Sequence, residues 1–559
     1  MREDNIAYRK LHLNHRKGEV YLSTVSGVAS TKPELVRKFD REITNIDIIT
    51  TKSFQVVPNP GNNPPVITSP KLGDFGNSVG LRNPGMEVAY PPLKEIREEG
   101  MRAILNVSLS ASTKEDFLTL VKRFDDIADM EELNFSCPHA AKGFGASIGT
   151  DIEAVREFVE YIATEYPERK SLLIIKLTPN VDNIGEIAKA AIDAGADGIA
   201  AINTVGPLLY EKDGKAILQN KVGGKGGASG EWVKDKAIEC ITEIRNAIGD
   251  DPIILGMGGV SSAEDARRMI EAGADSVGIG SAIARVYPTE WNAFFGAVKN
   301  GEDTKKYLSD DHSALEYERH TIEKKVMYDE ATVVLTLDGK GSCKAGEFVF
   351  LWIPGVGERP FSVAKNDPLS FIIKVRGEFT EKCRDLNVGD EIYVRGLCGK
   401  PIETRKADKA ILIGGGTGIV VLNLLAEELY KDGTKMDIRL GLPTAPVGKG
   451  LMQEDLEKYG KYTVVPDDGM PGRVLTTFDE KDVEGDTAIY VVGPTIMMKK
   501  AAERFMALGV KPERINISVE TQTMCGIGMC GECVCGGRIP CKQGTFLSWD
   551  YIINNNVEL

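Results

Sequence analysis

The chain has 559 residues, enough for about three or four domains of ordinary size. Apolar residues make up 42% and charged residues 27%, the balance of a soluble globular protein. The net charge of −14 argues against nucleic-acid binding through a basic surface. No apolar run is long enough to span a membrane, and the polar first residues lack a signal segment, so we expect a cytoplasmic protein.

Eight apolar, β-branched runs recur in the first 300 residues. They lie at residues 20–28, 46–53, 103–109, 132–137, 172–178, 198–204, 252–258 and 275–281. Amphipathic helical stretches separate them, at 151–166, 184–194, 233–248 and 263–272 among others. Near-continuous apolar runs are typical of parallel strands that are buried on both faces. Eight strand-then-helix units predict an α/β fold with a TIM barrel, and an open, doubly wound sheet is the alternative.

Polar residues and glycines follow the predicted strands, where a TIM barrel carries its active site. In chain order they are Lys52, Asn106, Asn134, Cys137, Lys176, Asn203, Thr204, Gly258 with Gly259, and Gly280 with Ser281. Taken singly, such a glycine is more often just a turn, and such a lysine is often on the surface. Glycines after the last two strands suit a phosphate site built from backbone N–H groups. Together these residues predict a phosphate-bearing cofactor in the barrel mouth.

Several of these segments resemble one enzyme family. Residues 134–139, 176–180, 203–204 and 256–260, with the Asn-Ser-Val-Gly-Leu-Arg-Asn-Pro-Gly loop at 77–85, are similar to flavin-dependent dihydroorotate dehydrogenases and to the catalytic domain of dihydropyrimidine dehydrogenase. The resemblance covers about residues 18–300. It implies FMN across the barrel mouth, and it implies as flavin contacts Lys52, Asn106, Lys176, Gly226, Gly227, Ser229, Gly258, Gly259, Gly280 and Ser281. It implies as substrate contacts Lys52, Asn77, Gly80, Leu81, Asn134, His139, Asn203 and Thr204.

The same resemblance makes Cys137 the general base, which removes the C5 proton of a dihydropyrimidine while C6 gives a hydride to the flavin. A thiol with an ordinary pKa near 8.5 lies within reach of neutral pH. The alternative is a small buried apolar side chain, as most lone cysteines are. His139 departs from the orotate-forming members, which have Asn there, and matches the dihydropyrimidine dehydrogenases. The loop at 77–85 is of the orotate type, so the substrate stays open between the two.

The segment at 309–320 is polar and predicts a linker. Short strands follow at 331–337, 347–353, 370–375 and 391–395, which predicts a small antiparallel barrel. It carries Arg359, Pro360, Phe361 and Ser362, and then Gly377 and Thr380. An arginine beside a strand is usually solvated. This Arg-Pro-Phe-Ser motif, however, resembles the FAD-binding signature of ferredoxin reductase-like proteins, in which the arginine pairs with the pyrophosphate.

A glycine turn follows the next apolar strand. The run Gly414, Gly415, Gly416, Thr417 and Gly418 leads into a helical segment, an arrangement that binds a dinucleotide pyrophosphate on backbone N–H groups. Gly493 and Pro494 after residues 490–492 resemble the turn beside the nicotinamide in the same reductases. No arginine or lysine cluster for a 2′-phosphate follows residues 438–442, which favours NAD over NADP.

Five of the ten cysteines lie between residues 525 and 541. The spacing Cys525-x4-Cys530-x2-Cys533 is that of plant-type [2Fe–2S] ligation, which needs a fourth thiolate. Cys541 supplies it in this interpretation, and Cys535 competes for the role. Zinc is the alternative metal, although it usually takes two Cys-x2-Cys pairs.

The modules in this order resemble the two subunits of NAD-linked dihydroorotate dehydrogenase fused into one chain. The predicted domains are an FMN barrel at 1–308, a linker at 309–320, an FAD barrel at 321–406, an NAD(P) domain at 407–515 and a [2Fe–2S] domain at 516–559. The resemblance implies oxidation of dihydroorotate by NAD⁺ through FMN, the cluster and FAD, in a homodimer formed through the barrel. Two alternatives remain: a NAD(P)H-dependent reductase of uracil, thymine or another conjugated carbonyl compound, and an electron-carrying or redox-sensing protein with an inactive barrel.

Overall fold

The computed structural model describes residues 2–15, 19–30, 32–136 and 148–559. The chain divides into two compact units: Met1–His312 with Ile527–Glu532, and Ser313–Gly526 with Cys533–Leu559. The finer division into four domains stays a prediction. In the described ranges, no helix combines the length and apolar character needed to cross a membrane.

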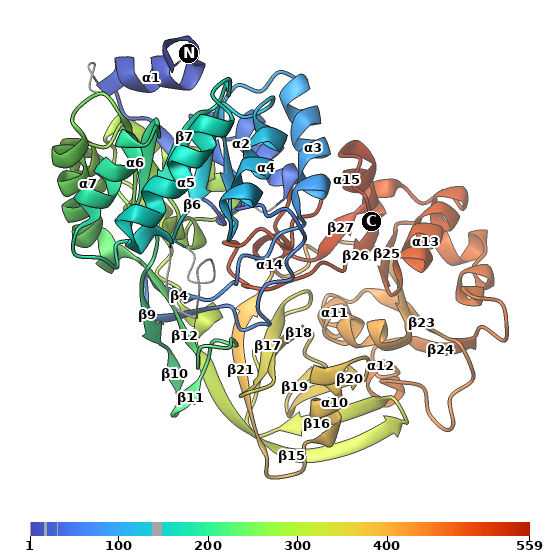
Figure 1. The fold of residues 1–559 in the computed structure, drawn as a ribbon. Coiled ribbons are helices and arrows are strands. Elements are labelled where there is room, and N and C mark those ends of the chain that lie inside the picture. The colour runs from blue at the N-terminus through green and yellow to red at the C-terminus, as the bar shows by residue number, and fades with distance from the viewer. Residues whose placement is uncertain (1, 16–18, 31, 137–147) are drawn as a thin grey trace. The chain divides into compact units, whose positions relative to one another are not determined.

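The first unit is built on a closed barrel of eight parallel strands (Figure 1), in the order β1-β14-β13-β8-β7-β6-β5-β2. The strands are β1 (Leu22–Thr24), β2 (Ile48–Thr50), β5 (Ile104–Leu109), β6 (Met130–Asn134), β7 (Leu172–Lys176), β8 (Gly198–Ala201), β13 (Ile253–Met257) and β14 (Ser276–Ile279). Each falls in or overlaps one of the eight predicted runs. The TIM barrel is therefore confirmed, and the open-sheet alternative is wrong.

Helices alternate with the barrel strands. They are α2 (Pro33–Arg41), α3 (Met86–Glu98), α4 (Lys114–Phe124), α5 (Ile152–Glu165), α6 (Ile184–Asp193), α7 (Lys234–Ile248), α8 (Ala263–Glu271) and α9 (Trp291–Asn300). The four helices predicted by range are found within one residue at each end. Side-chain caps fix several starts: Thr113, Asp151 and Ser262 accept hydrogen bonds from backbone N–H groups of the first turns of α4, α5 and α8.

The first unit contains two further elements outside the barrel, an N-terminal helix and a small antiparallel sheet. Helix α1 (Ile6–His15) packs Ala7 and Leu11 into the apolar cluster of the barrel interior. A four-stranded antiparallel sheet, in the order β3-β4-β12-β9, is formed by β3 (Ile67–Lys71), β4 (Asp74–Asn77), β12 (Lys225–Gly230) and β9 (Val205–Leu209), and the short strands β10 (Glu211–Lys212) and β11 (Lys215–Ala216) pair with each other. This sheet sets Asn77 opposite Gly227.

Strand β6 lies earlier in the chain than predicted. The prediction placed it at 132–137, but the strand runs from Met130 to Asn134, and a turn occupies Phe135 and Ser136. The acidic pair Glu131–Glu132 obscured its first half because charged residues are rare in buried strands. Both glutamates are nevertheless buried.

The second unit begins with an antiparallel sheet of seven strands, in the order β18-β17-β21-β15-β16-β20-β19. The strands are β15 (Tyr317–Asp329), β16 (Thr332–Leu337), β17 (Phe348–Ile353), β18 (Gly357–Phe361), β19 (Lys365–Asn366), β20 (Leu369–Lys374) and β21 (Glu391–Cys398). The predicted linker at 309–320 is wrong in its last residues, because β15 starts at Tyr317. Only Tyr317 and Ile322 of the 13 residues of β15 are buried, so it lacks the apolar alternation that marks a strand.

A six-stranded sheet follows, in the order β24-β23-β22-β25-β26-β27. Its strands are β22 (Lys409–Gly415), β23 (Lys435–Leu442), β24 (Lys461–Pro466), β25 (Thr487–Val492), β26 (Ile515–Ser518) and β27 (Phe546–Ser548). All neighbouring pairs are parallel except β26–β27. Alternate residues of β22 enter two different apolar cores, Ala410 and Leu412 in one and Ile411 and Ile413 in the other, as expected for a sheet covered on both faces.

Candidate active site

The barrel interior changes from apolar to polar along its strands. Ile48, Ile104, Met130 and Leu172 belong to the interior apolar cluster. Every second residue of a strand points the same way. Except for Ile174, the strand residues two and four positions further along are polar and buried: Thr50, Asn106, Ser108, Glu132, Asn134 and Lys176. We call these six residues the polar layer. It lies at the carboxyl ends of β2, β5, β6 and β7, where a TIM barrel places its chemistry.

Hydrogen bonds connect the polar layer. The Lys176 ammonium donates to Glu132 Oε1 at 3.2 Å, and the Ser108 hydroxyl donates to the same oxygen at 3.2 Å. The Ser108 hydroxyl also lies 2.9 Å from that of Ser53, which lies 3.0 Å from that of Ser26. A chain of three hydroxyls therefore leads from the loop after β1 to a buried carboxylate.

The amides predicted to bind the substrate ring also meet at this mouth. Asn203 Nδ2 donates to Asn134 Oδ1 at 3.4 Å, and Asn134 Nδ2 donates to Ser53 Oγ at 3.4 Å. Asn77 Nδ2 donates to the carbonyl of Gly227 at 3.3 Å. A Cβ on Gly227 would lie 2.1 Å from Thr204 Oγ1, so only glycine fits between these groups. Asn77, Thr204 and Gly227 thus form one cluster, and Asn134 and Asn203 form another.

Most of the remaining predicted barrel residues that the structure describes lie on turns or directly after strands. Gly80 and Leu81 both have a positive φ, of 75° and 54°. Gly258 and Gly259 follow β13, and Gly280 and Ser281 follow β14. Gly226 and Ser229 lie on β12. Cys137 and His139 lie outside the described residues, so their predicted roles stay predictions.

Lys52 is almost fully buried, two residues beyond the end of β2. Burial lowers its pKa from the ordinary value, and the nearby charge of Glu532 opposes this shift. Its Nζ would be 3.5 Å from a Cβ placed on Gly27 in the loop after β1. A buried amine at a strand end suits the binding of an anionic group.

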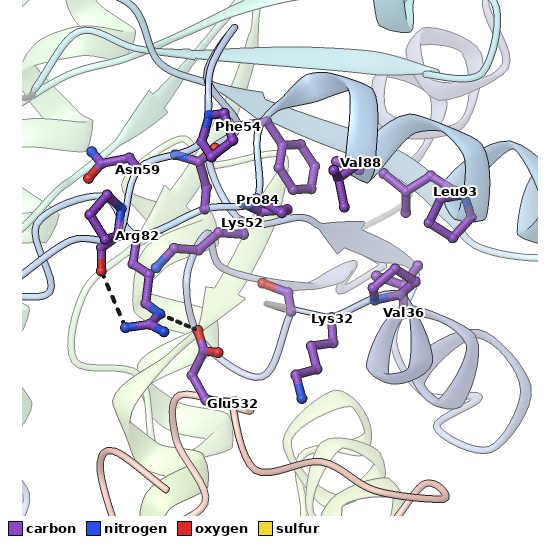
Figure 2. A pocket seen from close by; sticks show the side chains of 17 residues that line it. Lys32, Val36, Lys52, Phe54, Asn59, Arg82, Pro84, Val88, Leu93 and Glu532 are labelled. Carbon is purple, nitrogen blue, oxygen red and sulfur yellow. Dashed lines mark hydrogen bonds and ion pairs between the residues drawn. The ribbon is translucent and has the colours of Figure 1, made fainter. Parts of the chain in front are cut away.

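A cavity of about 520 Å³ opens beside Lys52. Figure 2 shows its apolar wall, which includes Phe54, Val36, Val88 and Leu93. The polar part includes Arg82, whose Nε lies 3.9 Å from Glu532 Oε1. Lys52 is the one predicted site residue among those that line the cavity, and no residue of the polar layer lines it, so the cavity is distinct from the polar layer.

Sequence comparison decides the family of the first unit. The dihydroorotate dehydrogenase family model matches residues 22–290. The NAD⁺-linked dihydroorotate dehydrogenase B catalytic subunit of Pyrococcus abyssi is 39% identical over 267 residues, which are 47% of this chain and 83% of that protein. The corresponding subunit of Methanocaldococcus jannaschii is 39% identical over 240 residues, 42% of this chain and 74% of that protein. The chain belongs to the dihydroorotate dehydrogenase family. It is therefore an oxidoreductase that acts on CH–CH groups.

The match to the dehydrogenase family model stops at residue 290, so the candidate sites of the second unit are inferred from its own geometry. Two residues at the end of β18 contact helix α10 (Glu378–Asp385). The Arg359 guanidinium lies 5.8 Å from the centre of the Phe379 ring, and the rings of Phe361 and Phe379 stack. Thr380 Oγ1 accepts the backbone N–H of Gly377 at 3.1 Å at the start of α10. These predicted FAD contacts are therefore brought together, with Pro360 and Ser362 beside them in the chain.

The two glycine turns predicted to bind NAD lie side by side. Numbered along the chain, the parallel strands have the order 3-2-1-4-5, in which β22 is first and β25 is fourth. Chain connections leave in opposite directions from these two strands, and such a switch point is where doubly wound sheets bind nucleotides. Gly414–Gly418 follows β22 and Gly493–Pro494 follows β25. A Cβ on Gly415 would meet Pro494 at 2.9 Å, and one on Gly418 would meet the Val492 carbonyl oxygen at 2.4 Å.

Three of the cysteines predicted to bind a cluster lie together in the second unit. The Cys541 thiol hydrogen-bonds with the thiols of Cys525 and Cys533, and these contacts and burial raise its pKa well above the ordinary value. Cys535 instead packs in an apolar core, and its backbone pairs with Arg538. In the part of the chain that the structure describes, no three His, Cys, Asp or Glu side chains surround a site for one metal ion. A [2Fe–2S] cluster has a different arrangement, because it shares four cysteines between two irons.

Sequence reasoning missed four residues of the barrel site: Ser26, Ser53, Ser108 and Glu132. Ser53, Ser108 and Glu132 each lie within two residues of a predicted one, whereas Ser26 lies in the loop after β1, far from any predicted residue in the sequence. Ser108 and Glu132 follow the same two-residue alternation as Asn106 and Asn134. Extending that alternation along each strand is the signal that would have found both.

Proposed function

We propose that the protein oxidises dihydroorotate to orotate and passes the two electrons to NAD⁺ within one chain. The polar layer, in which Asn134 is hydrogen-bonded to Asn203, is the main observation that supports the first half reaction. It places amide donors and acceptors at the mouth of a barrel whose relatives are named for this activity. Dihydroorotate loses a hydride from C6 and a proton from C5, and NAD⁺ gains a hydride, so one proton is released overall.

The barrel residues fit FMN. Asn106 Oδ1 is a buried oxygen with no partner within the described ranges, and Glu132 Oε2 is another. Unsatisfied buried oxygens of this kind are expected where a bound group supplies the missing donor. A Cβ on Gly226 would lie 2.4 Å from Leu218 Cδ1, and one on Gly227 would lie 2.1 Å from Thr204 Oγ1, so both positions require glycine. FMN supplies the hydride-accepting ring when it is bound. Lys52 and Lys176 provide positive charge at that ring, and the amides of Asn77, Asn134 and Asn203 orient the pyrimidine.

Cys137 is the proposed base, because it follows β6 directly after the turn at Phe135 and Ser136. Its task is to accept the C5 proton, and a thiolate does so near neutral pH at modest cost. The amide pair at Asn134 and Asn203 fixes the ring so that C5 and C6 are presented together.

The second unit carries the proposed route to NAD⁺. Support for FAD comes from Arg359 beside the start of α10, because a guanidinium and free backbone N–H groups both suit a pyrophosphate. Support for NAD⁺ comes from the two glycine turns at the switch point. Support for the [2Fe–2S] cluster comes from the grouping of Cys525, Cys533 and Cys541, with Cys530 as the fourth thiolate by its spacing.

The experiment is an anaerobic turnover assay on the purified full chain. With dihydroorotate and NAD⁺ we expect orotate and NADH in equal amounts, and slower turnover with dihydrouracil. Flavin analysis by chromatography and iron analysis on the same sample should show FMN, FAD and about two irons, the content of one cluster. Faster turnover of dihydrouracil would favour the reductase of uracil-type rings, for which His139 is the motivating residue. Absence of both reactions would contradict an active barrel.

A further inference from the structure

Strand β6 carries two adjacent buried glutamates that point to opposite faces. Glu131 lies on the outer face, where its Oε2 accepts the Ser171 hydroxyl at 2.6 Å. Glu132 lies in the barrel interior with the polar layer. Both side chains are 0% exposed. Because Glu131 and Glu132 have the same side chain in different surroundings, a substitution at Glu131 can serve as the control for the same substitution at Glu132.

The two glutamates differ in their charged partners. Burial raises the pKa of Glu131 well above the ordinary value, and the hydrogen bond from the Ser171 hydroxyl only partly opposes this shift. Glu132 instead receives the Lys176 ammonium, and both side chains of this pair are almost wholly buried, 0% and 6% exposed. A buried charge is tolerated when it is paired and hydrogen-bonded. The Glu132–Lys176 contact is therefore an internal ion pair within the proposed flavin site.

Glu132 can also accept hydrogen bonds beyond the one from Lys176. Its Oε1 accepts from Lys176 and Ser108, whereas Oε2 has no partner in the described part of the chain. Through Ser108 and Ser53 the same carboxylate is connected to Asn134, which is a proposed pyrimidine contact. The Glu132 carboxylate thus contacts Lys176, which is assigned to the flavin. Two hydroxyls also link it to Asn134, which is assigned to the substrate.

We propose that Glu132 is a positioning residue that holds Lys176 at the flavin and offsets its charge, so that it sets the balance between oxidised and reduced flavin. This inference rests on the proposed FMN site. Reduced flavin carries more negative charge than oxidised flavin, so an uncompensated ammonium beside it binds the reduced form more tightly. Glu132 weakens that preference by supplying a negative charge at 3.2 Å from the ammonium.

The test is the Glu132→Gln variant of the full chain, which removes the charge with little change in size. FMN is removed, and rebinding is measured by equilibrium dialysis, once with oxidised FMN and once with dithionite-reduced FMN. Chromatography separates FMN from FAD in each sample. We expect the ratio of the two Kd values, oxidised over reduced, to rise at least tenfold, equivalent to about 30 mV for a two-electron couple.

Glu131→Gln is the matched control, because it makes the same change on the other face of β6. Its ratio should stay within twofold of the wild type. Glu132→Asp keeps the charge, and its ratio should also stay near the wild type even if FMN binds more weakly. If Glu132→Gln shifts the ratio no more than Glu131→Gln does, Glu132 only fills space and the inference is wrong.

A second variant covers the case in which Glu132→Gln does not fold. Ser108→Ala keeps the ion pair but removes one donor to Glu132 Oε1, so more of the negative charge acts on the site. The ratio should then fall about twofold, and an unchanged ratio would overturn the inference. Failure of the wild-type protein to bind FMN at all would instead contradict the proposed function.

Discussion

The two units build their candidate sites in different ways. In the first unit, the polar layer takes its six residues from four strands that are far apart in sequence but adjacent in the barrel. In the second unit, the proposed NAD and FAD sites draw on short contiguous motifs, such as Gly414–Gly418 after β22. A barrel site therefore depends on closure of the whole sheet, whereas a glycine turn depends mainly on the strand before it and the helix after it.

This difference predicts how each unit responds to substitution. Loss of one side chain from the barrel site should affect chemistry and leave FMN and the second unit in place. Loss of one motif residue in the second unit should remove a cofactor and leave the barrel reaction intact. The following changes test that separation.

The largest effect is expected for Cys137→Ser. A serine hydroxyl is a far weaker base, so orotate formation at neutral pH should fall by about 10²–10⁴-fold, the usual contribution of a general base. FMN content should not change. The measurement is anaerobic bleaching of the flavin by dihydroorotate in a stopped-flow instrument.

Cys240→Ser is the control for that experiment. Cys240 is buried on helix α7, and burial raises its thiol pKa to about 11, so it is unsuited to act as a base. Its replacement should leave the rate within twofold. Equal rates in the Cys137→Ser and wild-type proteins would show that Cys137 only packs.

A smaller, separate effect is expected for Arg359→Ala. Loss of a charge-assisted contact to a pyrophosphate costs about 1.5–3 kcal/mol, so FAD affinity should fall by roughly 10- to 150-fold. FMN content and flavin bleaching by dihydroorotate should persist. Equilibrium dialysis against FAD measures this, with Arg384→Ala as control, because Arg384 pairs with Asp385 at the end of α10. An equal loss in both variants would argue against the assigned FAD contact.

The smallest effect is expected for His139→Asn. Asparagine presents an amide that both donates and accepts, whereas a neutral imidazole has one donor and one acceptor in different directions. We expect the ratio of kcat/KM for dihydroorotate over dihydrouracil to rise about tenfold, which is about 1.4 kcal/mol in the transition state. A ratio within twofold of the wild type would place substrate specificity elsewhere, in residues 77–85 or 206–227.

Sequence alone predicted the parts of the fold that repeat a clear pattern. The eight barrel strands and four of their helices follow from apolar periodicity, and the residues at the strand ends follow from the rule for TIM barrels. Glu132 was missed because a charged residue in an apolar run reads as a strand boundary. Strand β15 was missed because its charged, exposed side chains hide a backbone that pairs on both sides. Hydroxyl contacts such as Ser53 with Ser108 join distant segments, and no local pattern encodes them.

Cys530→Ser tests most directly whether an iron–sulfur cluster in this chain passes electrons from the oxidation of dihydroorotate to the reduction of NAD⁺. Under anaerobic conditions, dihydroorotate should still bleach FMN in this variant, and NADH should still reduce FAD. Formation of NADH from dihydroorotate should be lost, while Cys535→Ser, which alters a thiol packed in an apolar core, should retain it. NADH formation at the wild-type rate in Cys530→Ser would contradict the proposed route between the two units.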